Sequence, residues 1–288
     1  MCARSLTTCR RGGAAVTDWS LKLDGAAPRR IAITRETVAA ARDRLSPADT
    51  RAITMAAANI RVFHQLTVPV DTAIIETTPG VRSQLVWRPI ASAGLYVPGG
   101  SAPLFSSLLM LAIPATAAGV KRRVAVTPPT KDGEPHPAMI LAAAEGGLDD
   151  LWLIGGAQAI AALTFGVTLD EGEIAPCDKL FGPGNAWVAE AKRQAAALPG
   201  GPAVDMPAGP SELLVIADLA ADPVIVAADL LSQAEHDADA QVILVSDSKA
   251  AIAAIVEEVE AQLPSLPRAD IARAALSEGR AIKVRDLA

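Results

Sequence analysis

Segments with strand character alternate with helical segments through most of the chain, and this alternation constrains the fold more than any other feature. From Ser83 onward, each strand-like run is followed by a stretch in which Ala and Leu recur at helical spacing. The clearest strand-like runs are RRVAVT, DLWLIG, ELLVIAD and QVILVSD. This order is typical of a mostly parallel sheet with helices on both faces. The number of strand–helix repeats predicts an α/β protein with two such sheets.

The composition fits helices packed closely on a sheet. Hydrophobic residues make up 51% of the 288 residues but aromatic residues only 3%, so Ala, Val, Ile and Leu must form the core. The net charge of −6 gives no reason to expect binding to nucleic acid or to an anionic membrane. The longest apolar run, near Leu104 to Val120, is interrupted by Pro114 and does not reach the length of a membrane span.

The cysteines indicate a reducing compartment. Cys2, Cys9 and Cys177 are scattered, with neither metal-site nor disulfide spacing, so we expect a cytoplasmic protein. Cys177 precedes a predicted strand and has no identifiable histidine base, so we expect it to pack rather than to act as a nucleophile. The basic start, MCARSLTTCRRGG, is too short for a good transit peptide.

Four loops rich in glycine and proline are associated with predicted strands. They are VPGGSAP after Val97, IGGAQA after Ile154, FGPGNAW after Phe181 and DMPAGPSE around Gly209. Ligands of open α/β sheets bind at the carboxyl ends of strands, where the next helix offers free N–H groups to a phosphate. Each loop alone is more simply a turn, and no G-x-G-x-x-G fingerprint is present. Together they indicate a binding cleft, because each carries a polar side chain: Ser101, Gln158, Asn185 and Ser211.

One pair of side chains has the spacing of metal ligands. Gln233 and His236 lie three residues apart in LLSQAEHD, which is typical of the last turns of a helix, so they share one helical face. An amide oxygen and an imidazole nitrogen there can bind one metal ion. A catalytic zinc normally has about three protein ligands and an open position, so this pair is half of a site. The other histidines, His64 and His136, are predicted on distant helices.

Four longer stretches give the sequence a family resemblance. They are RPIASAGLYVPGGSAPLFSSLLMLAIPA, CDKLFGPGNAWVAEAKRQ, DMPAGPSELLVIAD and AADLLSQAEHD. In this order they resemble histidinol dehydrogenase, from about Gly25 to the end of the chain. The resemblance implies an enzyme that oxidises L-histidinol to L-histidine through histidinal, the last steps of histidine biosynthesis. It also implies that two NAD molecules are reduced at one zinc-containing site.

The resemblance implies functional roles for six side chains. The positions similar to the family's NAD contacts are Tyr96, Gln158 and Asn185. The positions similar to its substrate contacts are Ser211, Gln233 and His236, of which the last two would also bind zinc. In the mechanism that this implies, zinc lowers the pKa of the substrate alcohol, a general base removes its proton and hydride passes to NAD.

The family's fold implies two Rossmann-like domains, one inserted in the other. The first would be discontinuous, formed by residues 1–100 and 211–288, and would carry the zinc-ligand helix. The inserted domain would cover residues 101–210. Terminal elements of the family complete an intertwined homodimer whose active sites draw on both subunits. We therefore expect a homodimer with a small-molecule substrate and without a nucleic-acid or membrane partner.

The resemblance also identifies what these 288 residues lack. The family's catalytic Glu-His pair lies in a P-E-H-L-E segment that follows a stretch like AIKVRDLA, but the sequence ends at Ala288. The Asp and His that complete the zinc shell would also lie downstream, so no residue of this chain is expected to be the catalytic base. Three interpretations stay open. They are an inactive fragment of a histidinol dehydrogenase, an NAD- and zinc-dependent dehydrogenase of another small alcohol, and a catalytically dead module that binds a nucleotide or a partner chain.

Overall fold

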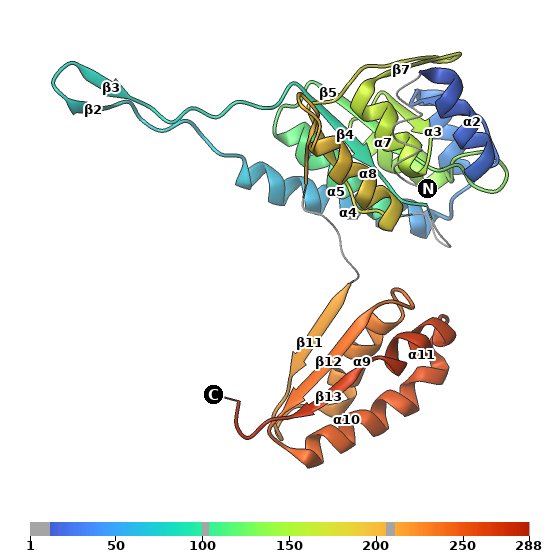
Figure 1. The fold of residues 1–288 in the computed structure, drawn as a ribbon, viewed down its shortest axis with the longest axis vertical. Helices are drawn as coiled ribbons and strands as arrows, with labels where there is room; N and C mark the ends of the chain where they lie inside the picture. The colour runs from blue at the N-terminus through green and yellow to red at the C-terminus, as the bar shows by residue number, and fades with distance from the viewer. Residues whose placement is uncertain (1–11, 100–103, 206–210, 288) are drawn as a thin grey trace. The chain divides into compact units, whose positions relative to one another are not determined.

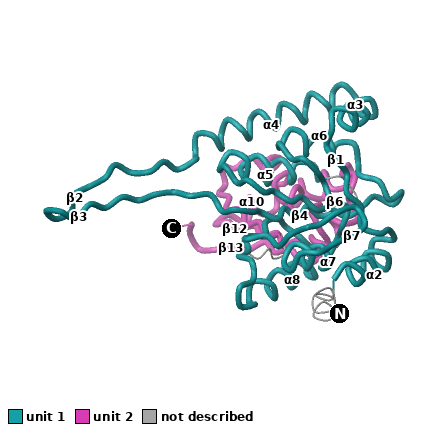
Figure 2. The backbone as a smooth tube through the Cα atoms, turned by 90° about the horizontal axis from the view of Figure 1, so that it is seen from above, with its two compact units in different colours: residues 1–208 teal, residues 209–288 magenta. Residues whose placement is uncertain are grey.

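The computed structural model describes residues 12–99, 104–205 and 211–287, so Ser101 and residues 206–210 of the DMPAGPSE loop lie outside the described residues. The chain forms two compact units, residues 1–208 and 209–288, coloured teal and magenta in Figure 2. Each unit is built on a sheet with parallel strands and helices, so the prediction of an α/β protein with two parallel sheets is confirmed. No helix of the described residues is long and apolar enough to cross a membrane.

A six-stranded sheet forms the centre of the first unit (Figure 1). The strand order is β1 (Arg29–Ala32), β6 (Asp150–Leu153), β5 (Arg122–Thr127), β4 (Ser92–Tyr96), β9 (Lys179–Phe181) and β10 (Ala203–Val204). Every pairing is parallel except that of the edge strand β1, which runs antiparallel to β6. The central strand β4 is buried along its whole length, as expected for a strand covered on both faces.

Two helical layers cover this sheet. One core contains residues of α4 (Pro47–Thr67), α5 (Phe105–Ala117) and α6 (Pro137–Glu145), and α3 (Arg35–Asp43) packs beside α6. The other core contains residues of α2 (Gly13–Leu23), α7 (Gly156–Phe165) and α8 (Ala186–Ala196), next to the small hairpin of β7 (Val167–Leu169) and β8 (Gly172–Ile174). Successive residues of one strand enter opposite cores: Val124 and Val126 enter the α7 side, whereas Ala125 enters the α5 side.

Local sequence signals fix where several helices begin. Thr34 accepts a hydrogen bond from the Thr37 N–H and Ser46 accepts one from the Asp49 N–H, so these two side chains cap α3 and α4. His136 caps α6 in the same way, because its Nδ1 accepts from the Ala138 N–H at 3.2 Å. This histidine therefore has a structural role.

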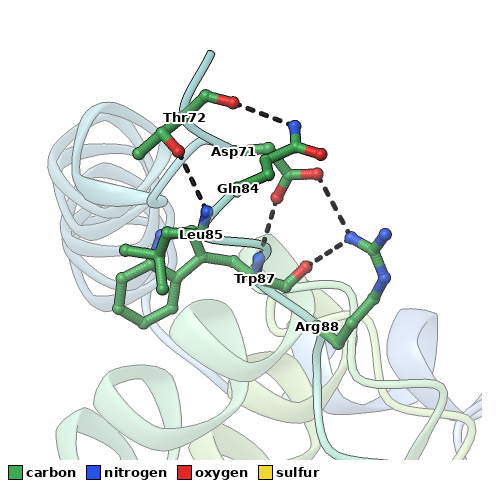
Figure 3. A network of polar contacts seen from close by, with 6 residues as sticks. All are labelled: Asp71, Thr72, Gln84, Leu85, Trp87 and Arg88. Carbon is green, nitrogen blue, oxygen red and sulfur yellow. Dashed lines mark hydrogen bonds and ion pairs between the residues drawn. The ribbon is translucent and has the colours of Figure 1, made fainter. Parts of the chain in front are cut away.

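A β-hairpin extends away from the rest of the first unit, as both views show (Figures 1 and 2). It is formed by β2 (Ile75–Thr78) and β3 (Val81–Ser83), and every residue of both strands is exposed. Polar contacts join the two sides of its stem (Figure 3): the Asp71 carboxylate accepts from the Trp87 N–H at 2.8 Å, and the Thr72 hydroxyl accepts from the Leu85 N–H at 3.0 Å. Hydrogen bonds within the hairpin and its stem thus stabilise this segment, while its apolar side chains are exposed to solvent.

The second unit contains a three-stranded parallel sheet. The strands are β11 (Glu212–Ile216), β12 (Gln241–Ser246) and β13 (Arg280–Lys283), in this order. Its helices are α9 (Pro223–Ala234), α10 (Lys249–Gln262) and α11 (Ala269–Ser277), with a short 3-10 turn at Leu263–Ser265. Leu214 and Ile216 of β11 are both more than half exposed, so one face of this strand is left uncovered within the unit.

The boundaries of these units differ from the expected discontinuous domain of residues 1–100 and 211–288. The expected boundary after residue 210 lies close to the division at 208/209. The expected boundary at residue 100 has no counterpart, because β4, which precedes it, pairs with β5 and β9, which follow it. Residues on both sides of position 100 therefore belong to one sheet.

Candidate functional site

A cavity of about 550 Å³ opens at the carboxyl edge of the six-stranded sheet. Its walls come from the ends of four parallel strands and from α2. The lining residues are Trp19, Leu23, Asp24, Tyr96, Pro98, Gly99, Pro128, Pro129, Thr130, Lys131, Gly156, Ala157, Gln158, Asn185 and Trp187. Strands β5 and β6 lie to one side of β4 and β9 lies to the other, so the cavity occupies a topological switch point of the sheet. The three expected NAD contacts, Tyr96, Gln158 and Asn185, all face this cavity.

Tyr96 stands at the end of β4 and is almost fully buried. Its hydroxyl oxygen accepts a hydrogen bond from the Gly156 N–H at 3.3 Å. Burial raises the pKa of this phenol to about 12. Tyr96 is therefore neutral at physiological pH and retains an O–H that can be donated to a ligand.

Gln158 and Asp24 form a buried polar pair on the wall of the cavity. Gln158 is fully buried, and its Nε2 donates to Oδ2 of Asp24 at 3.0 Å. The same carboxylate oxygen accepts from the Gly155 N–H at 3.0 Å. Burial raises the pKa of Asp24, although both hydrogen bonds oppose the shift. The other amide atom, Oε1 of Gln158, is buried and has no partner, which is a costly state for an acceptor that a bound donor would relieve.

Asn185 is the N-cap of α8. Its Oδ1 accepts from the N–H groups of Trp187 and Val188, both at 3.1 Å. These bonds use only the oxygen of the side-chain amide. Its two N–H groups can therefore donate to a ligand in the cavity. A single side chain can thus shape the start of the helix and face the cavity.

A buried ion pair holds the glycine-rich loop that leads to Asn185. Lys192 Nζ donates to the Gly182 carbonyl at 2.9 Å and pairs with the Asp205 carboxylate, which in turn accepts from the Gly182 N–H at 2.7 Å. Gly182 has φ 118, and an added Cβ would overlap the Tyr96 carbonyl oxygen. Only glycine fits where β9 ends so close to the end of β4.

The IGGAQA loop corrects one expectation. Free N–H groups were expected there for a phosphate, but the Gly155 N–H binds Asp24 and the Gly156 N–H binds Tyr96. The expectation is wrong for these two groups because a carboxylate from α2 and a phenol from β4 already occupy them. Sequence reasoning also missed Asp24, because its partners lie more than 130 residues away and no local motif marks it.

The second unit carries the other three expected site residues. Ser211 directly precedes β11, and its carbonyl accepts from the Gln241 N–H at 3.0 Å. Gln233 lies in the last turn of α9, where its Nε2 is buried without a partner, and the exposed His236 follows in the turn after the helix. No group of three His, Cys, Asp or Glu side chains that could hold a metal ion occurs among the described residues. The expected zinc-binding role of Gln233 and His236 therefore stays a prediction, and the pair alone would not make a complete zinc shell.

Comparison with known proteins identifies the family. The sequence profile of histidinol dehydrogenase matches residues 7–288. The chain belongs to the histidinol dehydrogenase family. It is 49% identical over 279 residues to histidinol dehydrogenase of Xylella fastidiosa (strain 9a5c), with 96% of this chain and 63% of that protein covered. It is 50% identical over 280 residues to histidinol dehydrogenase of Escherichia coli (strain K12), with 96% and 62% covered. The chain thus spans less than two thirds of the length of these relatives.

A solved structure agrees with this assignment. The crystal structure of histidinol dehydrogenase from Elizabethkingia anophelis matches with a TM-score of 0.90 at 43% identity, over 99% of this chain and 65% of that one. The bifunctional proline utilization A protein matches with a TM-score of 0.50 at 16% identity, which is a likeness of fold alone. The α/β architecture described above is therefore that of histidinol dehydrogenases.

Proposed function

We propose that this chain carries the NAD-binding cavity and part of the zinc site of a cytoplasmic histidinol dehydrogenase. The reaction would be the NAD- and zinc-dependent oxidation of L-histidinol to L-histidine through histidinal. The observation that carries the proposal is the meeting of Tyr96, Gln158 and Asn185 around one cavity at the switch point of the sheet. The residues were named from separate motifs of the sequence, and their convergence is what a dinucleotide site requires.

The groups around the cavity fit a nucleotide with both donors and acceptors. Gln158 would accept a hydrogen bond through its unpaired Oε1, and Tyr96 would donate from its neutral phenol. Trp19 and Trp187 line the same cavity and offer apolar surface to a base or to the nicotinamide ring. NAD supplies the hydride acceptor when bound.

Binding of NAD tests this assignment directly. Titration of NAD into the chain should quench the tryptophan emission, since Trp19 and Trp187 line the cavity. Gln158→Leu should weaken binding at least about tenfold, the loss expected when a buried hydrogen-bonding side chain is removed. Asn59→Leu, an exposed change in the middle of α4, is the matched control and should leave affinity unchanged. Absence of any NAD binding by the unaltered chain would refute the proposed cavity.

Gln233 and His236 would supply two ligands to a zinc ion, whose role when bound is to lower the pKa of the substrate alcohol. Ser211 would contact the substrate from the start of β11. Because two ligands hold zinc weakly, calorimetric titration should give an affinity no tighter than micromolar. Submicromolar zinc affinity that His236→Ala abolishes would contradict this expectation.

The purified 288-residue chain should produce no NADH from histidinol. The sequence contains no P-E-H-L-E segment to provide the base, and the described residues hold no complete metal-ligand group. Measurable histidinol-dependent turnover, in a preparation free of host enzyme, would overturn this proposal. Turnover of a different small alcohol would favour the second interpretation given above. NAD binding without turnover of any alcohol would favour the third interpretation, a catalytically dead module that binds a nucleotide.

An exposed apolar surface at the hairpin of β2 and β3 would bind a second copy of the chain. The protruding hairpin and the nearby end of α4 expose large apolar side chains, among them Phe63, Leu66, Val70, Ile75 and Trp87. Such a set is typical of a protein interface. Sedimentation equilibrium should show a dimer that Ile75→Asp weakens and that Thr77→Asp, an exposed change on the same strand, weakens less. A monomer at all concentrations would refute a homodimer of this chain.

A further inference from the structure

Asp24 is a wall residue of the cavity whose hydrogen bonding is only half satisfied. Both donors that reach it, the Gly155 N–H and Gln158 Nε2, bind the same oxygen, Oδ2. No donor of the described residues binds Oδ1. The neighbouring Oε1 of Gln158 is also buried without a partner. Asp24 and Gln158, two lining residues that are hydrogen-bonded to each other, therefore each have one oxygen without a donor among the described residues.

We propose that Asp24 and Gln158 together accept hydrogen bonds from the cis-diol of a ribose in the bound dinucleotide, an assignment that rests on the proposed NAD site. A vicinal diol presents two O–H donors on adjacent carbon atoms, which matches two neighbouring acceptors. Hydrogen bonds to an ionised carboxylate are shorter and stronger than neutral ones, so Asp24 would contribute more than Gln158. A phosphate is disfavoured at this position, because the carboxylate repels an anion and the Gly155 and Gly156 N–H groups already have partners.

The position of α2 supports a ligand-binding role for Asp24 over a purely structural one. The helix contributes Trp19 and Leu23 to the same wall, so the carboxylate follows an apolar surface that faces the cavity. A purely structural tether would be complete with Oδ2 alone, since both of its donors bind there. A purely structural role therefore does not explain the two acceptors that lack donors, Oδ1 of Asp24 and Oε1 of Gln158.

Asp24→Asn separates the two roles. The Asn carbonyl oxygen can keep the bonds from Gly155 and Gln158, whereas an N–H₂ donor replaces the acceptor that would face the ribose. NAD should bind this variant about tenfold more weakly, the loss expected for one hydrogen bond to a charged group, with an unchanged melting temperature. Asp18→Asn is the matched control, because it makes the same charge change at an exposed position of α2 and should bind NAD normally.

Two analogues identify the ribose. One is NAD with a 2′-deoxyadenosine, and the other is NAD with a 2′-deoxyribose on the nicotinamide side. One of them should bind the unaltered chain about tenfold more weakly than NAD. Either Asp24→Asn or Gln158→Leu, whichever removes the acceptor of the 2′-OH, should bind that analogue and NAD equally, because the two changes then remove the same interaction.

The outcomes distinguish this inference from the function it rests on. No NAD binding by the unaltered chain would refute the proposed function itself. NAD binding that Asp24→Asn leaves unchanged would refute only the role of Asp24. The ribose assignment is refuted if neither analogue loses affinity relative to NAD, or if both analogues lose as much in Asp24→Asn and in Gln158→Leu as in the unaltered chain.

Discussion

Asp205→Asn should destabilise the first unit strongly, because it leaves the Lys192 ammonium buried without a counter-charge. The Lys192 side chain is 7% exposed and that of Asp205 is 28% exposed, so the pair lies largely out of water. Both residues also bind Gly182, one through its carbonyl and the other through its N–H. The substitution therefore affects the ion pair and the loop that positions Asn185 together.

The expected loss follows from the burial of the pair. Removing one partner of a buried ion pair costs about 3–5 kcal/mol, and the partial exposure of Asp205 favours the lower end, about 3 kcal/mol. The double variant Lys192→Met, Asp205→Asn removes the charge as well as its partner and should cost only about 1–2 kcal/mol. The two single changes should thus be strongly non-additive.

Urea unfolding followed by tryptophan emission provides the measurement. All four tryptophans of the sequence lie in the first unit, so the signal reports that unit alone. Glu190→Gln, which removes an exposed ion pair with Arg193 on the same helix as Lys192, is the control and should show no measurable loss. A loss below about 1 kcal/mol for Asp205→Asn, or a double variant that costs the sum of the singles, would refute the reasoning.

Three further predictions concern single residues. Tyr96 is the one tyrosine of the sequence, so absorbance at alkaline pH should show no tyrosinate until the pH approaches 12. Its folded pKa lies above the ordinary 10.0, so the contribution of Tyr96 to stability should be constant below pH 10 and fall by about 1.4 kcal/mol per pH unit from there to 12. The difference between the unaltered chain and Tyr96→Phe in urea unfolding at each pH would show this. Burial raises the pKa of Cys177 to about 11, and Cys177→Ser should therefore leave the number of thiols that react rapidly with a disulfide reagent at pH 8 unchanged. Ser46→Ala should lower the free energy of unfolding by about 1 kcal/mol in the same urea assay, since the cap bond to the Asp49 N–H is lost, whereas a loss as large for the exposed Ser83→Ala would contradict the capping role.

The features that local sequence determines were predicted well. The strand–helix alternation and the glycine-rich turns depend on neighbouring residues, and the structure confirms both in the described residues. The helix starts at Thr34 and Ser46 are local in the same sense, because each depends on one side chain and an N–H three residues later. The meeting of three of these loops around one cavity follows from the parallel topology, which brings the carboxyl ends of the parallel strands to one edge.

The features that depend on distant contacts were not predictable in this way. The antiparallel edge strand β1 pairs with β6 across about 120 residues, and no turn signal links the two strands. A lysine near a loop is usually solvated, yet Lys192 is buried because Asp205 and the Gly182 carbonyl satisfy it. The domain boundary near residue 100 was misplaced because the sequence does not reveal that β4 pairs with strands on the far side of that loop.

In the proposed NAD site, Asp24 would also affect where the phosphates of the dinucleotide bind. The N-terminus of α7 would ordinarily attract an anion through its helix dipole and free N–H groups. Here a carboxylate offsets the dipole and takes the first N–H, so that end of the helix favours hydroxyl donors. Among the lining residues that the structure describes, Lys131 on the loop after β5 is the cationic one. In the proposed NAD site, a ribose would therefore lie beside α2 and α7 and a phosphate beside the loop after β5, the reverse of what the glycine-rich loop alone would suggest.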